Sequence, residues 1–260
     1  MLLVLLRILL VALLTLFWGV LVILLSFLDS YAERAVRLIR FWARGVLRVC
    51  GVKVRLHGRD RLNSQKACLF MANHQSYFDI PILIVAFDTL QVRWVSKHEV
   101  RKVPIIGLCM QVTHQVLVDR ESPTQAVAVI RQVKKLLAAG ISVIFFPEGT
   151  RTRDGHLQQF KPGGFAVAVE AGVPVVPVTI TGSRTLWPAD KFALYPGVVD
   201  VVFGEPIVIN PLLNKKAARE ELAVRVREAI VAQLRDDAPP LPPQEQPVLV
   251  PTSIPEPPTS

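Results

Sequence analysis

Cysteine is scarce in this sequence. The 260 residues include three cysteines, Cys50, Cys68 and Cys109, and no two of them have the Cys-x-x-Cys spacing. That distribution favours neither a disulfide framework nor a metal site, and we expect buried thiols in a reducing compartment. The sequence also lacks a Gly-x-Ser-x-Gly element, the usual setting of a serine nucleophile in α/β hydrolases. Nothing therefore points to a covalent intermediate formed on serine.

Acidic residues are outnumbered. There are 21 Asp and Glu against 30 Lys and Arg, which gives a net charge of +9. A basic balance favours an acidic partner, such as nucleic acid, an anionic membrane or a phosphorylated substrate. The sequence shows no zinc-finger cysteines, no aromatic RNA-binding motif and no Arg-rich recognition helix. We therefore expect no nucleic-acid partner, and the apolar N-terminal region favours a phospholipid membrane.

One long hydrophobic run lies near the N-terminus. Residues 8–28 carry no charge and are rich in Leu and Val. A bilayer span needs about 20 apolar residues, so the run is long enough to cross. A signal peptide is the alternative, but its apolar region is usually shorter and ends at a small-residue cleavage site. Residues 27–31 offer no such site, so we expect a retained membrane segment.

The next segment, residues 31–50, combines apolar residues with regularly spaced arginines. Their three- and four-residue steps place them on one face of a helix. Such a helix can lie in the headgroup layer of an anionic membrane, and its abundance of Arg indicates the cytoplasmic side. The alternative is an ordinary surface helix packed on the domain. The arginines are Arg34, Arg37, Arg40, Arg44 and Arg48.

Beyond residue 53 the sequence alternates short apolar runs with helical patterns. The helices that we predict cover residues 123–139, with Ser122 as the cap and Gly140 at the end, and residues 215–235. Several of the apolar runs are continuous, as in strands that are covered on both faces. The predicted strands are 67–72, 92–96, 115–118, 142–146, 175–180 and 199–203.

This alternation predicts an α/β domain whose central sheet is largely parallel and flanked by helices. We expect three parts: an N-terminal hydrophobic and amphipathic helical membrane anchor at 1–50, the α/β domain at 51–235, and a tail at 236–260. The tail holds nine prolines and no core-forming pattern. We therefore expect the tail to be disordered or extended.

His74 and Asp79 form the first candidate site, directly after an apolar strand and before a helical run at 80–87. Five steps leave two residues roughly 140° apart on a helix and on opposite faces of a strand. The two side chains can meet only if the chain turns between them. A strand-to-helix junction supplies that turn, with Asp79 near the helix start. The pair would then act as a general base and its carboxylate partner; a capping Asp beside an incidental surface His is the alternative.

Three further segments also contain or end in an apolar strand. Residues 145–151 follow one strand, and their Arg151 suits bidentate binding of a phosphate, with Gly149 allowing close approach of the backbone. Asp119 and Arg120 end another strand. The last, residues 173–178, contains two prolines, so we expect an edge strand or a local distortion that shapes a site wall.

Taken in their order along the chain, with the Asp119-Arg120 segment second, the four segments resemble the blocks of the glycerolipid acyltransferase family, whose best-known members are the 1-acylglycerol-3-phosphate acyltransferases. The resemblance covers roughly residues 35–210, and the pairing of His-x4-Asp with Phe-Pro-Glu-Gly-Thr-Arg is its most specific part. The second block departs from the family pattern, which usually has an aromatic residue and Ile before Asp-Arg. From that block we therefore carry over Arg120 alone.

The resemblance implies a role for each matching residue. His74 would be the general base and Asp79 its partner. The residues that would bind the phosphate and glycerol of the acceptor are Arg120, Glu148, Gly149, Thr150 and Arg151, with Lys97 as a further basic position. No metal and no cofactor are expected, because a thioester is already an activated acyl donor.

The predicted reaction moves an acyl chain from acyl-CoA or acyl-carrier protein to the sn-2 hydroxyl of 1-acylglycerol 3-phosphate (lysophosphatidic acid). The product would be phosphatidic acid, a step of phospholipid biosynthesis. Amides near His74 would hold the oxyanion. Alternative acceptors are another lyso-lipid, such as a lyso-aminolipid, or glycerol 3-phosphate. A lipid or thioester hydrolase and a non-catalytic membrane scaffold are the competing classes. We expect the catalytic domain on the cytoplasmic face of a membrane, which in a bacterium would be the inner membrane.

Overall fold

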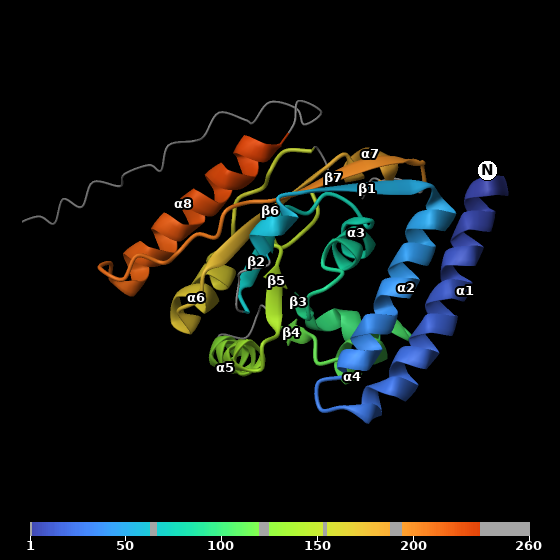
Figure 1. The fold of residues 1–260 in the computed structure, drawn as a ribbon, viewed down its shortest axis with the longest axis horizontal. Coiled ribbons are helices and arrows are strands. Elements are labelled where there is room, and N and C mark those ends of the chain that lie inside the picture. Colours follow the sequence, from blue (N-terminus) through green and yellow to red (C-terminus); the bar gives the residue numbers. More distant parts are fainter. Residues whose placement is uncertain (1, 63–66, 120–124, 153–154, 188–193, 235–260) are drawn as a thin grey trace, which may run out of the picture.

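A seven-stranded sheet forms the centre of the molecule (Figure 1). The computed structural model describes residues 2–62, 67–119, 125–152, 155–187 and 194–234. The strand order is β1-β7-β6-β2-β5-β3-β4, and every neighbouring pair is parallel except β6 with β7. The predicted α/β fold with a largely parallel sheet is therefore confirmed. The strands are β1 (Val52–His57), β2 (Leu69–Ala72), β3 (Val92–Lys97), β4 (Val116–Val118), β5 (Ser142–Phe145), β6 (Val175–Thr181) and β7 (Gly197–Phe203).

Helices cover both faces of this sheet, with α5, α6 and α8 on one side and α1, α2 and α3 on the other (Figure 1). β2 shows the effect of this burial. Its Phe70 belongs to the buried cluster that includes side chains of α2 and α3, whereas its Met71 belongs to the cluster that includes side chains of α5, α6 and α8. The helices are α1 (Leu2–Leu25), α2 (Glu33–Cys50), α3 (Asp79–Ala86), α4 (Ile106–Val112), α5 (Gln125–Ala138), α6 (Pro162–Ala171), α7 (Ser183–Leu186) and α8 (Lys215–Gln233).

All six predicted strands are present, and the sequence analysis missed β1. This strand alternates apolar and charged residues, and it pairs with β7 alone at the edge of the sheet. The predicted helices at 123–139 and 215–235 correspond to α5 and α8. Gly140, with φ of +78°, follows α5 in the left-handed conformation that glycine adopts at little cost. The proposed cap, Ser122, lies outside the described residues.

The placement of the proline-containing strand contradicts the edge position, one of the two alternatives predicted for it. β6 lies inside the sheet, between β7 and β2, and not at an edge. Pro177 is tolerated because the antiparallel ladder with β7 begins only at Val178, one residue after the proline. The carbonyl of Pro177 accepts a hydrogen bond from Gly204, just past the end of β7, so the missing N–H faces the end of that ladder. The strand residues around it are buried in the core and do not line the cavity described below.

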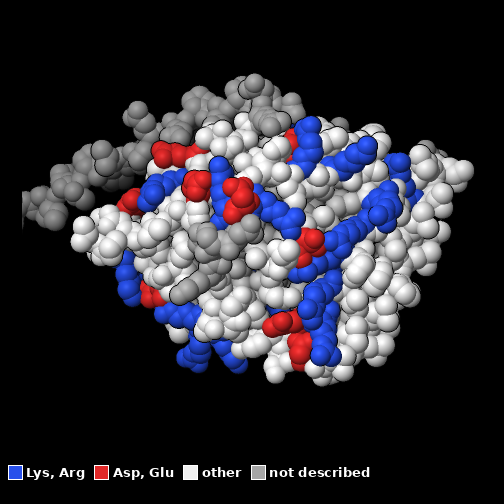
Figure 2. Space-filling view, viewed as in Figure 1, with Lys and Arg blue, Asp and Glu red and all other residues white. Residues whose placement is uncertain are grey.

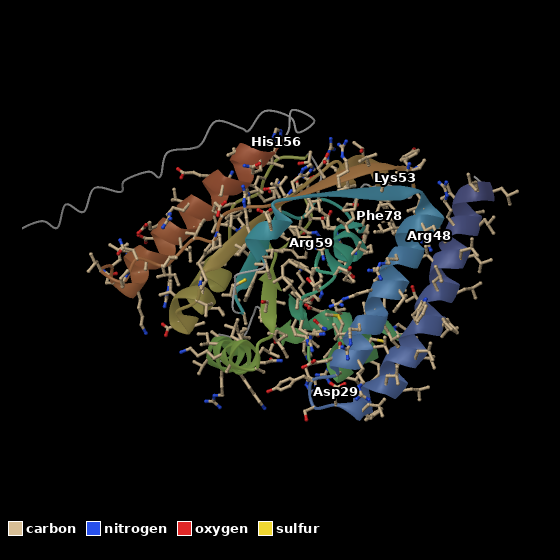
Figure 3. The ribbon with its side chains drawn as sticks, in the orientation of Figure 1. Asp29, Arg48, Lys53, Arg59, Phe78 and His156 are labelled. Atoms are coloured by element: carbon tan, nitrogen blue, oxygen red, sulfur yellow. The ribbon has the colours of Figure 1, made fainter. Side chains whose placement is uncertain are left out.

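The N-terminal helices α1 and α2 form an antiparallel pair that packs against the sheet domain (Figure 1). Asp29 lies at the turn between them, and Arg48 lies near the other end of α2 (Figure 3). Both oxygens of Asp29 accept backbone N–H groups at the start of α2, from Glu33 and Arg34. The pair is thus a defined structural unit and not two independent segments.

A buried arginine ties this turn to the sheet. Arg93 of β3 is completely buried, and its guanidinium donates a hydrogen bond of 2.6 Å to the carbonyl of Tyr31. Burial lowers the pKa of Arg93 to about 10, and the charges of Glu33 and Asp29 oppose that effect. The side chain therefore remains a cation at neutral pH and connects the N-terminal helix pair to the central sheet.

Candidate active site

His74 and Asp79 meet at the carboxyl end of β2, in the geometry that their spacing predicts. The chain leaves β2 after Ala72 and turns through residues 73–78, and α3 begins at Asp79. The Nδ1 atom of His74 lies 2.7 Å from Oδ2 of Asp79. Because a buried carboxylate accepts hydrogen bonds, Nδ1 carries the proton and Nε2 is left as the basic nitrogen.

The side chain of Asp79 is itself fixed by hydrogen bonds from the backbone of the same loop. The carboxyl group is completely buried, and Oδ2 also accepts the N–H groups of Gln75 at 2.7 Å and Ser76 at 2.8 Å. With the ring N–H of His74, three donors therefore surround this one oxygen atom at the start of α3. The carboxylate therefore fixes both the tautomer and the orientation of the imidazole.

Asn73 anchors the loop at its other end. Its side-chain amide donates to the carbonyl of Ile180 at 2.9 Å, and its side-chain oxygen accepts the N–H of Ile180 at 2.7 Å. These two bonds extend the pairing of β2 and β6 by one residue, so the loop leaves the sheet from a fixed point. The sequence analysis assigned Asn73 no role, although the residue stands directly before His74.

Residues 146–152 follow the neighbouring strand β5 and pack directly on His74. The ring of Phe146 stacks on the imidazole, with 3.9 Å between ring centroids and 14° between planes. The N–H of Thr152 donates to the carbonyl of His74 at 3.0 Å. Gly149 has φ of +75°, and its N–H closes a turn onto the carbonyl of Phe146. Two motifs distant in sequence therefore build one site.

Glu148 lies behind the His74 loop. Its side chain is almost completely buried, with Oε1 accepting the N–H of His74 at 2.7 Å and Oε2 accepting the N–H of Gln158 at 2.8 Å. Burial raises the pKa of Glu148 to about 7, against the lowering effect of these two hydrogen bonds. The residue does not line the cavity described below. Its assignment as a ligand of the acceptor stays a prediction, and its contacts are with the backbone.

Arg151 is oriented differently and contributes to the wall of a cavity. Its guanidinium lies over the ring of Tyr77, 3.9 Å from the ring centroid. Partial burial lowers the pKa of Arg151, and Nε has no hydrogen-bond partner among the described residues. The side chain is thus a partly desolvated cation held by an aromatic ring, which is a suitable setting for binding an anion.

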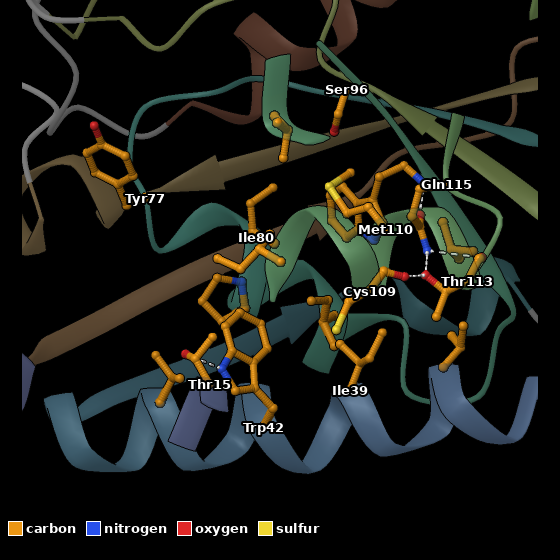
Figure 4. Close-up of a pocket in the computed structure, with 18 of the residues that line it drawn as sticks. Thr15, Ile39, Trp42, Tyr77, Ile80, Ser96, Cys109, Met110, Thr113 and Gln115 are labelled. Atoms are coloured by element: carbon orange, nitrogen blue, oxygen red, sulfur yellow. Dashed lines mark hydrogen bonds between the residues drawn. The ribbon is translucent and has the colours of Figure 1, made fainter. Parts of the chain in front are cut away.

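The cavity has a volume of about 630 Å³ and combines polar and apolar walls. His74, Lys97 and Arg151 contribute to it from the ends of β2, β3 and β5. Apolar side chains from α1, α2, α3 and α4 form a large part of the remaining wall, among them Ile39, Trp42, Ile80 and Met110 (Figure 4). Such a cavity suits a molecule with a long apolar part and an anionic group.

Of the other predicted site residues, Gly149, Thr150 and Lys97 line this cavity. Arg120 lies outside the described residues. Sequence reasoning also missed two aromatic residues of the wall, Tyr77 and Trp187, whose rings lie 5.1 Å apart. Tyr77 stands inside the His-x4-Asp segment. Trp187 belongs to none of the sequence motifs, and only the tertiary fold brings it to the cavity.

The predicted oxyanion site needs a correction. Amide N–H groups near His74 were expected to be free for an oxyanion, but most of them already donate within the protein. Those that donate are the amides of His74, Gln75, Ser76 and Phe78. In this conformation these four groups support the loop and do not face a reacting carbonyl.

Comparison with known proteins gives a consistent family. The model of the Acyltransferase family matches residues 53–181. The 1-acyl-sn-glycerol-3-phosphate acyltransferase of Pseudomonas aeruginosa is 30% identical over 192 residues, which cover 72% of this chain and 73% of that protein. The one from Chlamydomonas reinhardtii is 36% identical over 191 residues, or 72% of this chain and 57% of that protein. This chain spans about half the length of the algal and plant relatives that it matches.

A solved structure extends the likeness to three dimensions. The crystal structure of the 1-acyl-sn-glycerophosphate acyltransferase of Thermotoga maritima matches with a TM-score of 0.71 and 26% sequence identity. The match covers 89% of this chain and 96% of that chain. It therefore extends well beyond the segment matched by the family model.

Proposed function

This chain belongs to the acyltransferase family, and from that premise we propose that it transfers a fatty acyl group to the sn-2 hydroxyl of 1-acylglycerol 3-phosphate, forming phosphatidic acid. The observation that carries the proposal is the buried His74–Asp79 pair, with His74 lining the same cavity as Arg151. A base, an anion ligand and an apolar space are the three features that this acceptor requires. The donor is a thioester, either acyl-CoA or acyl-carrier protein.

The reaction begins with proton transfer to His74. Nε2 takes the proton of the acceptor hydroxyl, and the alkoxide oxygen attacks the carbonyl carbon of the thioester. The tetrahedral intermediate then collapses, the carbon–sulfur bond breaks, and the thiolate leaves with the proton that His74 returns. The carboxylate of Asp79 stabilises the imidazolium that forms in between. The proposed acceptor phosphate pairs with Arg151, while Lys97 supplies a second cation in the same cavity.

Product analysis tests this proposal. The full chain in vesicles or detergent is incubated with acyl-CoA or acyl-carrier protein and a panel of lyso-lipids plus glycerol 3-phosphate, and the products are identified by mass spectrometry. We expect phosphatidic acid from 1-acylglycerol 3-phosphate and little free fatty acid. Thioester cleavage that does not depend on an acceptor would instead assign a hydrolase.

The apolar N-terminal helix indicates membrane association. Among the residues that the structure describes, Leu2–Leu28 forms one helical stretch long and apolar enough to cross a membrane. Large apolar side chains are exposed along its whole length, and a band of Lys and Arg runs beside this uncharged surface (Figure 2). The apolar face of α2 is itself covered by α1 and the sheet domain, so α2 does not insert it into a membrane.

We propose that α1 lies within one leaflet and does not cross the bilayer. α2 runs along α1, with Trp42 donating to the Thr15 hydroxyl at 3.0 Å and Phe41 stacked on Trp18. A spanning α1 would carry the exposed arginines of α2 through the hydrocarbon, at a cost of about 2.5–3.5 kcal/mol for each one placed at the centre. With α1 in the acyl-chain region, those arginines instead reach the headgroups on the cytoplasmic side.

Replacing Arg34, Arg37 and Arg48 together by Gln should weaken binding to anionic vesicles. All three side chains are exposed, and each arginine near such a surface contributes about 1 kcal/mol. Vesicle sedimentation at low salt should show roughly a 100-fold weaker partition, and the difference should shrink as salt rises. Binding to neutral vesicles should not change. The matched control replaces Arg131, Lys134 and Arg225, on α5 and α8, by Gln. An equal loss of vesicle binding in this control would show that the arginines of α2 have no special role.

A further inference from the structure

Both carboxylate oxygens of Glu148 are engaged by backbone N–H groups in the described conformation, and the residue does not line the cavity. Oε1 lies 2.7 Å from the backbone nitrogen of His74, and Oε2 lies 2.8 Å from the backbone nitrogen of Gln158. The side chain is 2% exposed. A carboxylate that accepts two N–H groups on its two oxygens, out of contact with the cavity, is a connector between two backbone segments.

The same segment holds His74 from two further directions. The N–H of Thr152 donates to the carbonyl of His74 at 3.0 Å, and the ring of Phe146 stacks on the imidazole at 3.9 Å. Residues 146–152 therefore contact the backbone N–H, the backbone carbonyl and the ring of one residue. We call this set of contacts the His74 clamp. Asp79 then fixes the remaining rotation of the ring.

The clamp is braced from the far side by α8. Arg227 donates to the carbonyls of Leu157 and Gln158, at 3.2 Å and 3.0 Å. The N–H of Gln158 is the group that holds Oε2 of Glu148. A continuous chain of contacts thus runs from α8 through residues 157–158 and Glu148 to the backbone of His74. Every link lies outside the cavity except His74 itself.

We infer that Glu148 is a positioning residue that places His74 for proton transfer, and not a ligand of the acceptor. The inference rests on the proposed acyl transfer, in which His74 is the base. A base must lie within hydrogen-bond reach of the proton that it removes, and a displacement of about 1 Å can lower a rate about 100-fold. Moving the backbone nitrogen of His74 moves the ring with it.

The charge on Glu148 matters to this role. Burial is the main cause that raises its pKa to about 7; the N–H groups of Gln158 and His74 oppose it, the negative charge of Asp79 adds to it, and the positive charge of Arg227 opposes it. An ionised Glu148 accepts both N–H groups, whereas a protonated one directs a hydrogen toward one of those donors. The clamp is therefore complete above about pH 7 and weakens as the pH falls below it.

The decisive variant is Glu148→Gln in the full chain, assayed with 1-acylglycerol 3-phosphate and acyl-CoA. Gln has the same shape, but its amide nitrogen must face either His74 N–H or Gln158 N–H, so one hydrogen bond is lost. We expect kcat to fall about 10–100-fold, with both KM values within about threefold of wild type. The acid limb of the kcat profile should also lose the contribution of Glu148. Glu170→Gln, which alters a surface ion pair with Lys215 and Arg219, is the matched control and should behave like wild type.

A second measurement follows the loop itself and does not depend on turnover. Hydrogen exchange of a peptide covering residues 73–79 should be faster in Glu148→Gln, while peptides from β2 and α8 keep their protection. Together with the activity assay, this measurement separates the two hypotheses. A wild-type protein without transferase activity would contradict the proposed function, whereas unchanged exchange of the loop in Glu148→Gln would contradict the clamp.

A raised KM for the acceptor at unchanged kcat would overturn the inference and make Glu148 a ligand. If Glu148→Gln does not fold, Arg227→Met carries the test, because it removes the brace and leaves every cavity residue in place. That variant should lower kcat several-fold at unchanged acceptor KM. An unaltered kcat or a raised acceptor KM in Arg227→Met would overturn the inference as well.

Discussion

Replacing His74 by Ala should lower kcat/KM for acyl transfer by about 10²–10⁴-fold, the usual effect of removing a general base. The imidazole is the one group of the pair that lines the cavity, so its removal leaves the acceptor hydroxyl without a base. The fold should survive, because Asp79 keeps its bonds to Gln75 and Ser76 and the loop keeps Asn73. Membrane binding and the thermal unfolding midpoint should stay close to wild type.

Asp79→Asn tests the partner in the same assay. Asn offers one oxygen and one donor where the native carboxylate accepts three N–H groups at one oxygen, so the tautomer of His74 is no longer fixed. Turnover should drop, with acceptor KM less affected than kcat. His57→Ala is the control: this residue pairs with Asp200 between β1 and β7, outside the cavity. Near-normal turnover by purified His74→Ala would eliminate His74 as the base.

The backbone geometry of His74 and Asp79 was predictable because few conformations bring the two side chains together. A helix or a strand separates residues five positions apart, so a polar pair after an apolar strand requires a turn. The strands were predictable for a related reason. Those in the middle of the sheet are buried on both faces and are continuous apolar runs, whereas β1 alternates because one of its faces is exposed.

The role of Glu148 was not predictable from its motif. A carboxylate in a loop after a strand can face a ligand or the backbone, and only the side-by-side packing of β2 and β5 decides between them. That pairing brings residue 148 to the amide of residue 74. The hydrogen bonds of the amides near His74 were not predictable for the same reason, because their acceptors are set by the folded loop and its packing on residue 148.

The cavity depended still more on tertiary packing. Its walls include residues of α1 and α4, which no local pattern relates to the His-x4-Asp segment. Gly19 of α1 permits their approach, since a Cβ at that position would lie 2.2 Å from Cγ2 of Ile105. The N-terminal helices therefore also complete the cavity next to the strand ends that carry His74 and Lys97.

Arg151→Lys should impair the use of 1-acylglycerol 3-phosphate far more than the use of acyl-CoA. The phosphate monoester of this acceptor carries nearly two negative charges and no amine that compensates for them. A guanidinium can meet it with two parallel hydrogen bonds, whereas an ammonium retains the charge and loses the fork. The structure adds a second loss, because the flat guanidinium lies over Tyr77 at 3.9 Å and an ammonium stacks less well.

The expected loss is about 1.5–3 kcal/mol for a charged hydrogen bond, or roughly 10–150-fold in kcat/KM, with most of it in the acceptor KM. The measurement is KM and kcat/KM for wild type and Arg151→Lys with lysophosphatidic acid and with lysophosphatidylcholine, whose phosphate carries one charge beside a quaternary amine. The second acceptor should lose much less. Arg225→Lys, on the exposed face of α8, controls for the substitution itself. Equal losses with both acceptors, or a loss confined to the acyl donor, would mean that Arg151 does not bind the acceptor phosphate. The pattern expected here is the opposite of that expected for Glu148→Gln, so the two variants separate binding of the acceptor from placement of the base.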